Sequence, residues 1–151
     1  MKIVSKNLGE TNKIAEDFSN KIKNPLGRPQ GEEASATVVG LFGDLGSGKT
    51  TFTQALGKIL GVKEVMTSPT FVIEKRYDLD GRFGFKRLVH IDAYRLEKGK
   101  ELLSLNFIED TTNSENLILI EWPERVGDVL PADLVPINFK FISEFEREIE
   151  Y

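Results

Sequence analysis

The sequence of 151 residues predicts an α/β fold with a mostly parallel central sheet and helices on both faces. Two observations lead to this fold class. Segments with the helical spacing of apolar residues alternate with short apolar runs through the middle of the chain. These runs are apolar at nearly every position, which is typical of strands that are buried on both faces. A chain of this length is expected to form a single domain, residues 1–151, around one core.

The helical segments are predicted over residues 10–22, 49–60 and 97–105. The first has apolar side chains four residues apart, beginning at Ile14, with Thr11 or Asn12 as its N-cap. The second stops at Gly61, because glycine commonly follows the last turn of a helix. Residues 24–36 contain two prolines and two glycines, all of them before residue 33, and this stretch is expected to be an exposed loop.

The strands are predicted over residues 37–42, 71–77, 85–91, 117–120, 135–142 and 147–151. The first of these is rich in β-branched and apolar residues, and the fourth is wholly apolar. The second and third flank residues 78–81, which end in Asp80-Gly81. Since Asp-Gly between two strand-like runs is a hairpin signal, we expect these two strands to pair.

Composition excludes several classes of protein. The chain has no cysteine, which excludes disulfide scaffolds, thiolate zinc sites and cysteine nucleophiles. Its apolar runs fall far short of the ~18 residues of a membrane span, and its first residues soon turn polar, so we expect neither a membrane anchor nor a signal peptide. A pI of about 5.2 argues against a surface built to neutralise nucleic-acid phosphates. We therefore expect a cytoplasmic protein.

One motif stands out, between a predicted strand and a predicted helix. Residues 43–50 read Gly-Asp-Leu-Gly-Ser-Gly-Lys-Thr and satisfy the pattern G-x-x-x-x-G-K-[ST]. In such loops backbone amides surround phosphate oxygens, and the helix N-terminus adds partial positive charge. Lys49 would bridge the β- and γ-phosphates, and the Thr50 hydroxyl would hold Mg²⁺. A glycine-rich turn that only caps the helix is the alternative. The expected nucleotide-binding residues are Asp44, Leu45, Gly46, Ser47, Gly48, Lys49, Thr50 and Thr51.

The sequence favours ATP over GTP by elimination. Guanine recognition in P-loop GTPases uses Asn-Lys-x-Asp late in the chain, whereas residues 12–15 read Asn-Lys-Ile-Ala and precede the loop. Residues 78–81 match the D-x-x-G of a GTPase switch, but they lie in a predicted hairpin turn.

Two carboxylates stand at the ends of predicted strands. Asp92 and Glu121 would meet at the edge where parallel strands open onto a ligand crevice, and carboxylate oxygens suit Mg²⁺. Each acid could instead simply terminate its strand. His90 would point to the same face as Asp92, and a scaffold role is favoured over a role as a base. Residues 67–70 are either a loop that senses the γ-phosphate or a plain turn.

Four segments together resemble the TsaE family of bacterial P-loop ATPases, formerly named YjeE. They are residues 43–51, 67–71 (Thr-Ser-Pro-Thr-Phe), 90–96 (His-Ile-Asp-Ala-Tyr-Arg-Leu) and 121–124 (Glu-Trp-Pro-Glu). The resemblance implies a three-layer α/β P-loop domain and a weak, Mg²⁺-dependent ATPase. It also implies action on the TsaB–TsaD complex in the threonylcarbamoyladenosine modification of tRNA next to the anticodon, with tRNA contacted through that complex.

The resemblance further implies roles for individual residues. Thr50 and Glu121 look like Mg²⁺ ligands, and Asp92 looks like an acid that orients water or metal beside the catalytic Lys49. Residues 101–106 keep the framework of an acidic stretch of the family but lose some of its polar positions. The other implied site residues are Thr11 near the nucleotide, the switch loop Ser68, Pro69 and Thr70, and a wall or partner-facing group of His90, Tyr94, Arg95 and Trp122.

Two other functions stay open from the sequence. A small-molecule kinase needs a mobile, arginine-rich lid to exclude water. The arginines here are scattered, although Arg87 and Arg95 could reach a γ-phosphate. A nucleotide-sensing module without meaningful hydrolysis is the third possibility.

Overall fold

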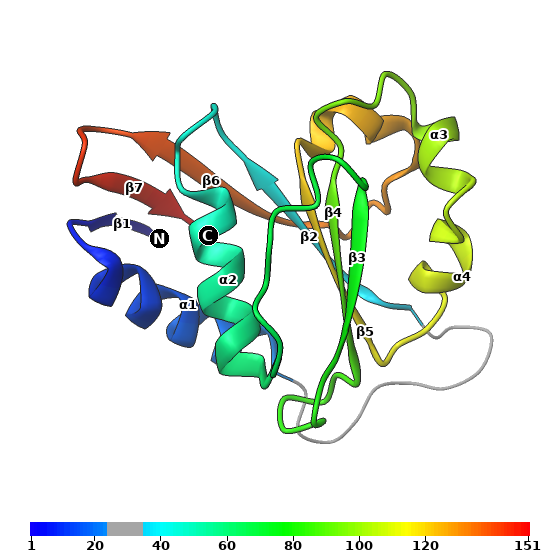
Figure 1. The fold of residues 1–151 in the computed structure, drawn as a ribbon, viewed down its shortest axis with the longest axis horizontal. Helices are drawn as coiled ribbons and strands as arrows, with labels where there is room; N and C mark the ends of the chain where they lie inside the picture. Colours follow the sequence, from blue (N-terminus) through cyan, green and yellow to red (C-terminus); the bar gives the residue numbers. More distant parts are fainter. Residues whose placement is uncertain (24–34) are drawn as a thin grey trace.

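The computed structural model describes residues 1–23 and 35–151, and a seven-stranded sheet forms its centre (Figure 1). The strands lie in the order β1-β7-β6-β2-β5-β4-β3. The predicted loop 24–36 lies outside the described residues except for Ser35 and Ala36. The strands are β1 (Lys2–Ser5), β2 (Thr37–Phe42), β3 (Glu74–Asp78), β4 (Arg87–Asp92), β5 (Asn116–Glu121), β6 (Val135–Phe141) and β7 (Arg147–Glu150).

Strand direction differs between the centre and the edges of the sheet. Strands β6, β2, β5 and β4 run parallel, which confirms the predicted parallel centre. The pairs β3–β4, β6–β7 and β1–β7 are antiparallel. The first two are hairpins, since a short connection between consecutive strands permits only antiparallel pairing. The two termini meet at one edge, where the amino group of Met1 donates to Tyr151 O at 2.7 Å.

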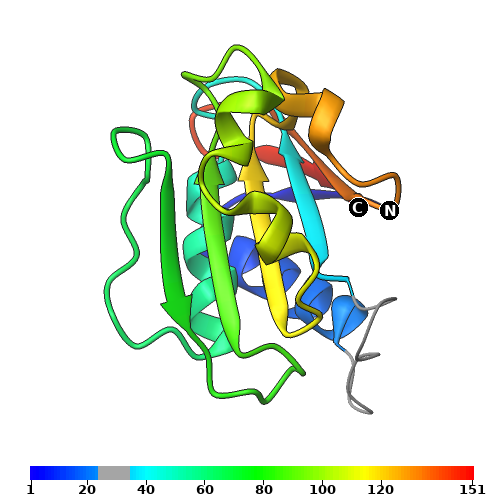
Figure 2. The same ribbon diagram turned by 90° about the vertical axis from the view of Figure 1, so that its right-hand side faces the viewer.

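Helices cover both faces of the sheet (Figure 2). Helices α1 (Leu8–Ile22) and α2 (Lys49–Leu60) pack on one face. The short helices α3 (Gly99–Leu103) and α4 (Phe107–Thr111) cover the other, together with the 3₁₀ helix η1 (Pro123–Val129). This arrangement confirms the three-layer α/β architecture.

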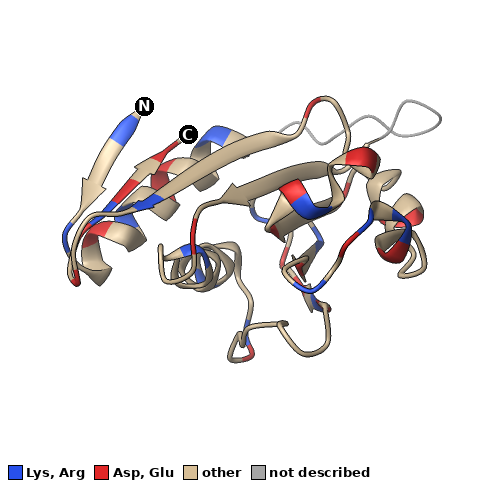
Figure 3. Cartoon of the chain, turned by 90° about the horizontal axis from the view of Figure 1, so that it is seen from above, with Lys and Arg blue, Asp and Glu red and all other residues tan. Residues whose placement is uncertain are grey.

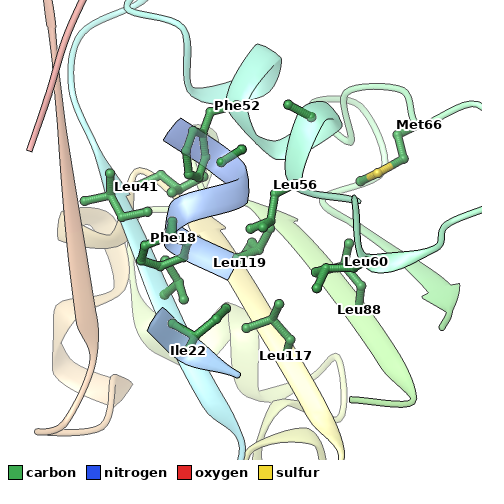
Figure 4. Close-up of a cluster of buried hydrophobic side chains, with 14 of the residues drawn as sticks. Phe18, Ile22, Leu41, Phe52, Leu56, Leu60, Met66, Leu88, Leu117 and Leu119 are labelled. Atoms are coloured by element: carbon green, nitrogen blue, oxygen red, sulfur yellow. The ribbon is translucent and has the colours of Figure 1, made fainter. Parts of the chain in front are cut away.

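Alternate residues of the central strands face the two cores. On β5, Leu117 and Leu119 join the cluster under α1 and α2, whereas Ile118 and Ile120 join the opposite cluster. Figure 4 shows the first core, in which side chains from α1 and α2 meet those from β2, β4 and β5. Because successive side chains of a strand point to opposite faces, the same alternation directs Glu121 toward the α2 side.

The N-terminus of α1 differs from the prediction. The helix begins two residues before the predicted start, and its N-cap is Asn7, whose Oδ1 accepts a hydrogen bond from Glu10 N at 2.9 Å. Glu10 in turn accepts from Lys6 N, so its side chain binds the backbone just before the N-cap. Neither Thr11 nor Asn12 caps the helix.

Other predicted boundaries also need correction. The predicted helix 97–105 is shorter in the structure, where it corresponds to α3 alone, and α4 was not predicted. Asn106, with a left-handed φ of 63°, separates these two helices. Strand β3 starts later than predicted, after Ile73 with φ of 69°. The β3–β4 hairpin is confirmed, but its connection spans residues 79–86 rather than a tight turn. Neither β1 nor η1 was predicted.

The surface carries charges of both signs. Seen from above, acidic and basic residues are interspersed over the same elements (Figure 3), in keeping with the formal net charge of -4. Within residues 1–23 and 35–151, none of the helices combines the length and apolar character needed to cross a bilayer.

Candidate nucleotide-binding site

A cleft of about 620 Å³ opens at the carboxyl ends of the parallel strands. This volume is in the usual range of sites for small organic molecules. The β2–α2 loop, the ends of β4 and β5, and the segment before β3 form one side, and the outer strands with the start of α1 form the other. On the first side the lining residues are Leu45, Gly46, Ser47, Gly48, Lys49, Thr50, Thr51, Ser68, Thr70, Asp92, Tyr94, Glu121 and Trp122.

Glycine at three positions shapes the loop between β2 and α2. Gly43, Gly46 and Gly48 have φ of 146°, 74° and 101°, values that glycine adopts far more readily than other residues. A Cβ at Gly43 would lie 2.5 Å from Phe139 O, so the loop packs directly on the backbone of β6. Gly48 is the N-cap of α2 and offers no side-chain acceptor, which leaves the helix N-terminus open to an anion.

Lys49 reaches back over this loop from the first turn of α2. Its Nζ donates to Gly43 O at 2.6 Å and to Asp44 O at 2.8 Å, and it lies 4.5 Å from the centre of the Trp122 ring. Burial lowers the pKa of Lys49 below its ordinary 10.5, while Glu121 and other nearby carboxylates oppose that shift in part. A phosphate anion at this position would favour the charged ammonium that burial disfavours.

Thr50 and Glu121 are brought together from α2 and β5. Thr50 Oγ1 donates to the Glu121 carboxylate, at 3.2 Å from Oε1 and 3.4 Å from Oε2. His90 Nε2, from the neighbouring strand β4, lies 2.9 Å from Glu121 Oε1. Glu121 and His90 are only 4% and 1% exposed, so this contact lies within the protein rather than on its surface.

Asp92 stands beside Glu121, since the two are register partners across β4 and β5. Asp92 Oδ2 accepts from Thr70 Oγ1 at 2.9 Å, and Oδ1 accepts from Tyr94 N at 3.0 Å. Ser68 Oγ lies 2.6 Å from Thr70 Oγ1. The segment 68–70 is therefore tied to the end of β4 through hydroxyl groups, at the position where the sequence predicts a switch loop.

Aromatic side chains form a wall of the cleft. The Trp122 and Tyr94 rings lie 5.0 Å apart, and the Arg125 guanidinium lies 5.4 Å from the Tyr94 ring. Trp122 has φ of 58°, an uncommon conformation for a residue with a side chain and one that recurs at functional sites. Arg95 does not line the cleft and instead lies 4.6 Å from the exposed ring of Phe71.

The remaining predicted residues divide between the cleft and its surroundings. Thr11 lines the cleft, and its Oγ1 lies 2.7 Å from Ser5 Oγ. His90 lies behind Glu121 rather than in the wall of the cleft. The carbonyl oxygen of Asp44 accepts a hydrogen bond from Lys49 Nζ. The carbonyl oxygen of Pro69 accepts one from Ile73 N at 2.6 Å, within the turn that precedes β3.

Apart from Thr11, the residues on the second side of the cleft were not predicted from the sequence. This side combines the start of α1 with the β6–β7 hairpin, which come together because β1 pairs with β7. Strand β1, at the start of the chain, was not recognised, although the cap formed by Asn7 and Glu10 is a local signal for the start of α1. The residues on this side are Ser5, Lys6, Asn7, Leu8, Thr11, Phe139, Glu144, Phe145, Arg147 and Ile149.

The donor groups of the cleft fit Mg²⁺ bound together with phosphate. Within the described part of the chain, no three His, Cys, Asp or Glu side chains form a metal-binding cluster. Mg²⁺ in nucleotide sites is commonly held by one or two protein oxygens plus phosphate and water, so such a cluster is not required. Thr50 donates its hydroxyl hydrogen to Glu121 and keeps its lone pairs for a cation.

Comparisons with known proteins identify the family of the chain. A family model described as "Threonylcarbamoyl adenosine biosynthesis protein TsaE" matches residues 5–149. The tRNA threonylcarbamoyladenosine biosynthesis protein TsaE of Bacillus subtilis is 37% identical over 114 residues, which cover 76% of this chain and 68% of that protein. The protein of the same name from a Nostoc species is 39% identical over 129 residues, or 83% and 76% of the two chains. The crystal structure of Bacillus subtilis YdiB superposes with a TM-score of 0.68 at 30% identity, covering 99% of this chain and 82% of that one. The sequence resemblance is thereby confirmed, and the chain belongs to the TsaE family.

Proposed function

We propose that this chain is a Mg²⁺-dependent, weakly active ATPase subunit in tRNA threonylcarbamoyladenosine biosynthesis. Membership of the TsaE family supports the pathway, and the resemblance supports the TsaB–TsaD complex as partner, with tRNA reached through that complex. The contact of Thr50 with Glu121, at the N-terminus of α2 and beside the loop, is the observation that carries the ATPase assignment.

In this proposal each polar group of the first side has a task. The loop amides and Lys49 bind the phosphates, with Nζ exchanging its contacts to loop carbonyls for phosphate oxygens. Thr50 and Glu121 hold Mg²⁺, which offsets phosphate charge when it is bound. Asp92, anchored by Thr70, orients the water that attacks the γ-phosphorus as the bond to the ADP oxygen breaks.

A kinase function has less support from the arginines. Arg87 begins β4, five residues before Asp92, and therefore lies roughly 17 Å from the site at 3.3 Å per strand residue. The expectation that it could reach a γ-phosphate is wrong. Arg95 lies over Phe71, and Arg76 is engaged by Asp110 at 2.6 Å. Among arginines, Arg147 alone lines the cleft within the described residues.

The proposal is tested with E121Q and a matched control, E115Q. Glu115 precedes β5 at its opposite end and forms a surface ion pair with Lys86. Both variants lose one carboxylate charge near the same strand, but only one loses the group beside Thr50. Nucleotide affinity is measured with and without Mg²⁺, and ATP hydrolysis is measured for the chain alone and with TsaB–TsaD.

We expect the wild type and E115Q to show weak hydrolysis that rises with TsaB–TsaD, and a tRNA-modification assay to depend on the chain. For E121Q we expect Mg²⁺ no longer to raise nucleotide affinity and hydrolysis to fall at least tenfold. An unchanged Mg²⁺ titration of E121Q would assign the metal to Asp92 instead. Phosphate transfer to a metabolite would support a small-molecule kinase instead. If D92A abolishes hydrolysis but tRNA modification persists, the chain would be a nucleotide-sensing module.

A further inference from the structure

His90 is a buried polar residue that the proposed mechanism does not use. It lies on β4 between register partners Lys75 on β3 and Leu119 on β5. The preceding residue on the same face, Leu88, is fully buried in the core under α2. An aliphatic side chain would therefore suit packing at this position, and the imidazole needs another explanation.

The hydrogen bond of His90 determines which ring nitrogen carries the hydrogen. Nε2 lies 2.9 Å from Glu121 Oε1, and an ionised carboxylate only accepts hydrogen bonds, so Nε2 donates. The other nitrogen, Nδ1, is buried and has no hydrogen-bond partner among the described residues. A buried polar atom without a partner is unfavourable, and each case needs a reason. The contact that His90 does make, from Nε2 to Glu121, supplies such a reason.

The hydrogen bond from His90 Nε2 restricts rotation of the Glu121 carboxylate. Oε1 receives hydrogen bonds from His90 at 2.9 Å and from Thr50 at 3.2 Å, whereas Oε2 receives the longer contact from Thr50 at 3.4 Å. Two donors on one oxygen hold the carboxylate in one orientation. Oε2 is then the oxygen that remains for a further ligand beside the Thr50 hydroxyl.

We propose that His90 is a positioning residue, which orients Glu121 for a divalent cation without touching the cation itself. The inference rests on the proposed function, because it takes Glu121 as a cation ligand. Residues that orient a metal ligand from behind commonly change metal affinity 10- to 100-fold when they are replaced.

Three substitutions separate this role from packing. The amide nitrogen of H90Q can occupy the place of Nε2, that of H90N is one methylene shorter, and H90L fills a comparable volume without any donor. I91V is the matched control, since Ile91 lies on the same strand but faces the opposite core. Thermal unfolding of each metal-free protein shows whether it is folded and how far its stability has changed.

The readout is Mn²⁺ affinity, measured by electron paramagnetic resonance of the free ion with protein saturated by ADP, and with ADP alone as the reference. We expect H90Q and I91V to remain within about threefold of the wild type, and H90N and H90L to lose about 10- to 100-fold. Equal affinity in all four variants would overturn the positioning role, and so would a loss in H90Q as large as that in H90L. If the wild-type protein adds no Mn²⁺ binding to ADP, the proposed cation site itself fails, and the role of His90 fails with it.

Discussion

Replacing Gly43 with alanine tests how closely the phosphate-binding loop packs on β6. The new Cβ would lie 2.5 Å from Phe139 O and 2.8 Å from Ser47 Oγ, far inside the 3.4 Å at which ordinary contact begins. A strained backbone conformation such as φ of 146° costs about 1–3 kcal/mol for a residue with a side chain. Displacing the close-packed backbone of β6 costs about 1–3 kcal/mol more. The free energy of unfolding is therefore expected to fall by about 2–6 kcal/mol.

The matched control is G81A in the β3–β4 connection. Gly81 also has a positive φ, 83°, but a Cβ there would have no atom within 4 Å. Its expected loss is only the conformational one, about 1–2 kcal/mol. Urea denaturation of both variants measures the free energy of unfolding, and the difference between them contains the steric contribution together with any difference in backbone strain.

Nucleotide binding provides a second readout for G43A. Because the loop must move away from Phe139 O, its amides would leave their positions around the phosphates, and ATP affinity should fall with stability. A G43A protein as stable as G81A would show that the loop does not pack against β6 as described. ATP affinity equal to that of the wild type in a destabilised G43A would show that the loop contact serves the fold alone.

Three further measurements test other contacts. Trp122 is the only tryptophan, and its ring lies 4.5 Å from Lys49 Nζ, so ATP with Mg²⁺ should change its fluorescence; no change would place the nucleotide elsewhere. Since burial lowers the pKa of Lys49, the unfolded chain binds more protons above the folded-state pKa and up to about 10.5. In this pH range the contribution of Lys49 to the free energy of unfolding therefore increases with pH. Urea denaturation at several pH values in the range should show this increase in the wild type but not in K49M. Arg76 contacts both Asp110 oxygens, at 2.7 and 2.6 Å, and D110N removes the negative charge from this contact. The free energy of unfolding should fall by about 2 kcal/mol, less than for a fully buried ion pair, because Arg76 is partly exposed. A loss below about 0.5 kcal/mol would show that the ion pair is not needed to hold α4 against β3.

Local signals made part of the site predictable from the sequence. Helix α2 has the predicted bounds, because Gly48 and Gly61 mark both of its ends with left-handed conformations. The loop before it was recognisable because its pattern of glycines, lysine and threonine is contiguous. Asp92 and Glu121 could be placed at strand ends, since an apolar run stops at each of them and parallel strands share one open edge.

The contacts that build the cleft depended on the tertiary structure. Thr50 and Glu121 are 71 residues apart, and only the parallel order of β2, β5 and β4 brings their side chains within hydrogen-bond distance. The second side of the cleft arises from pairing between the two ends of the chain, which no local pattern encodes. The sequence by itself therefore determined which groups could bind phosphate and a cation, because those signals lie within single segments. The folded structure decided which oxygen of Glu121 is held by His90 and how Thr70 meets Asp92, because such hydrogen bonds form only when distant strands and loops pack together.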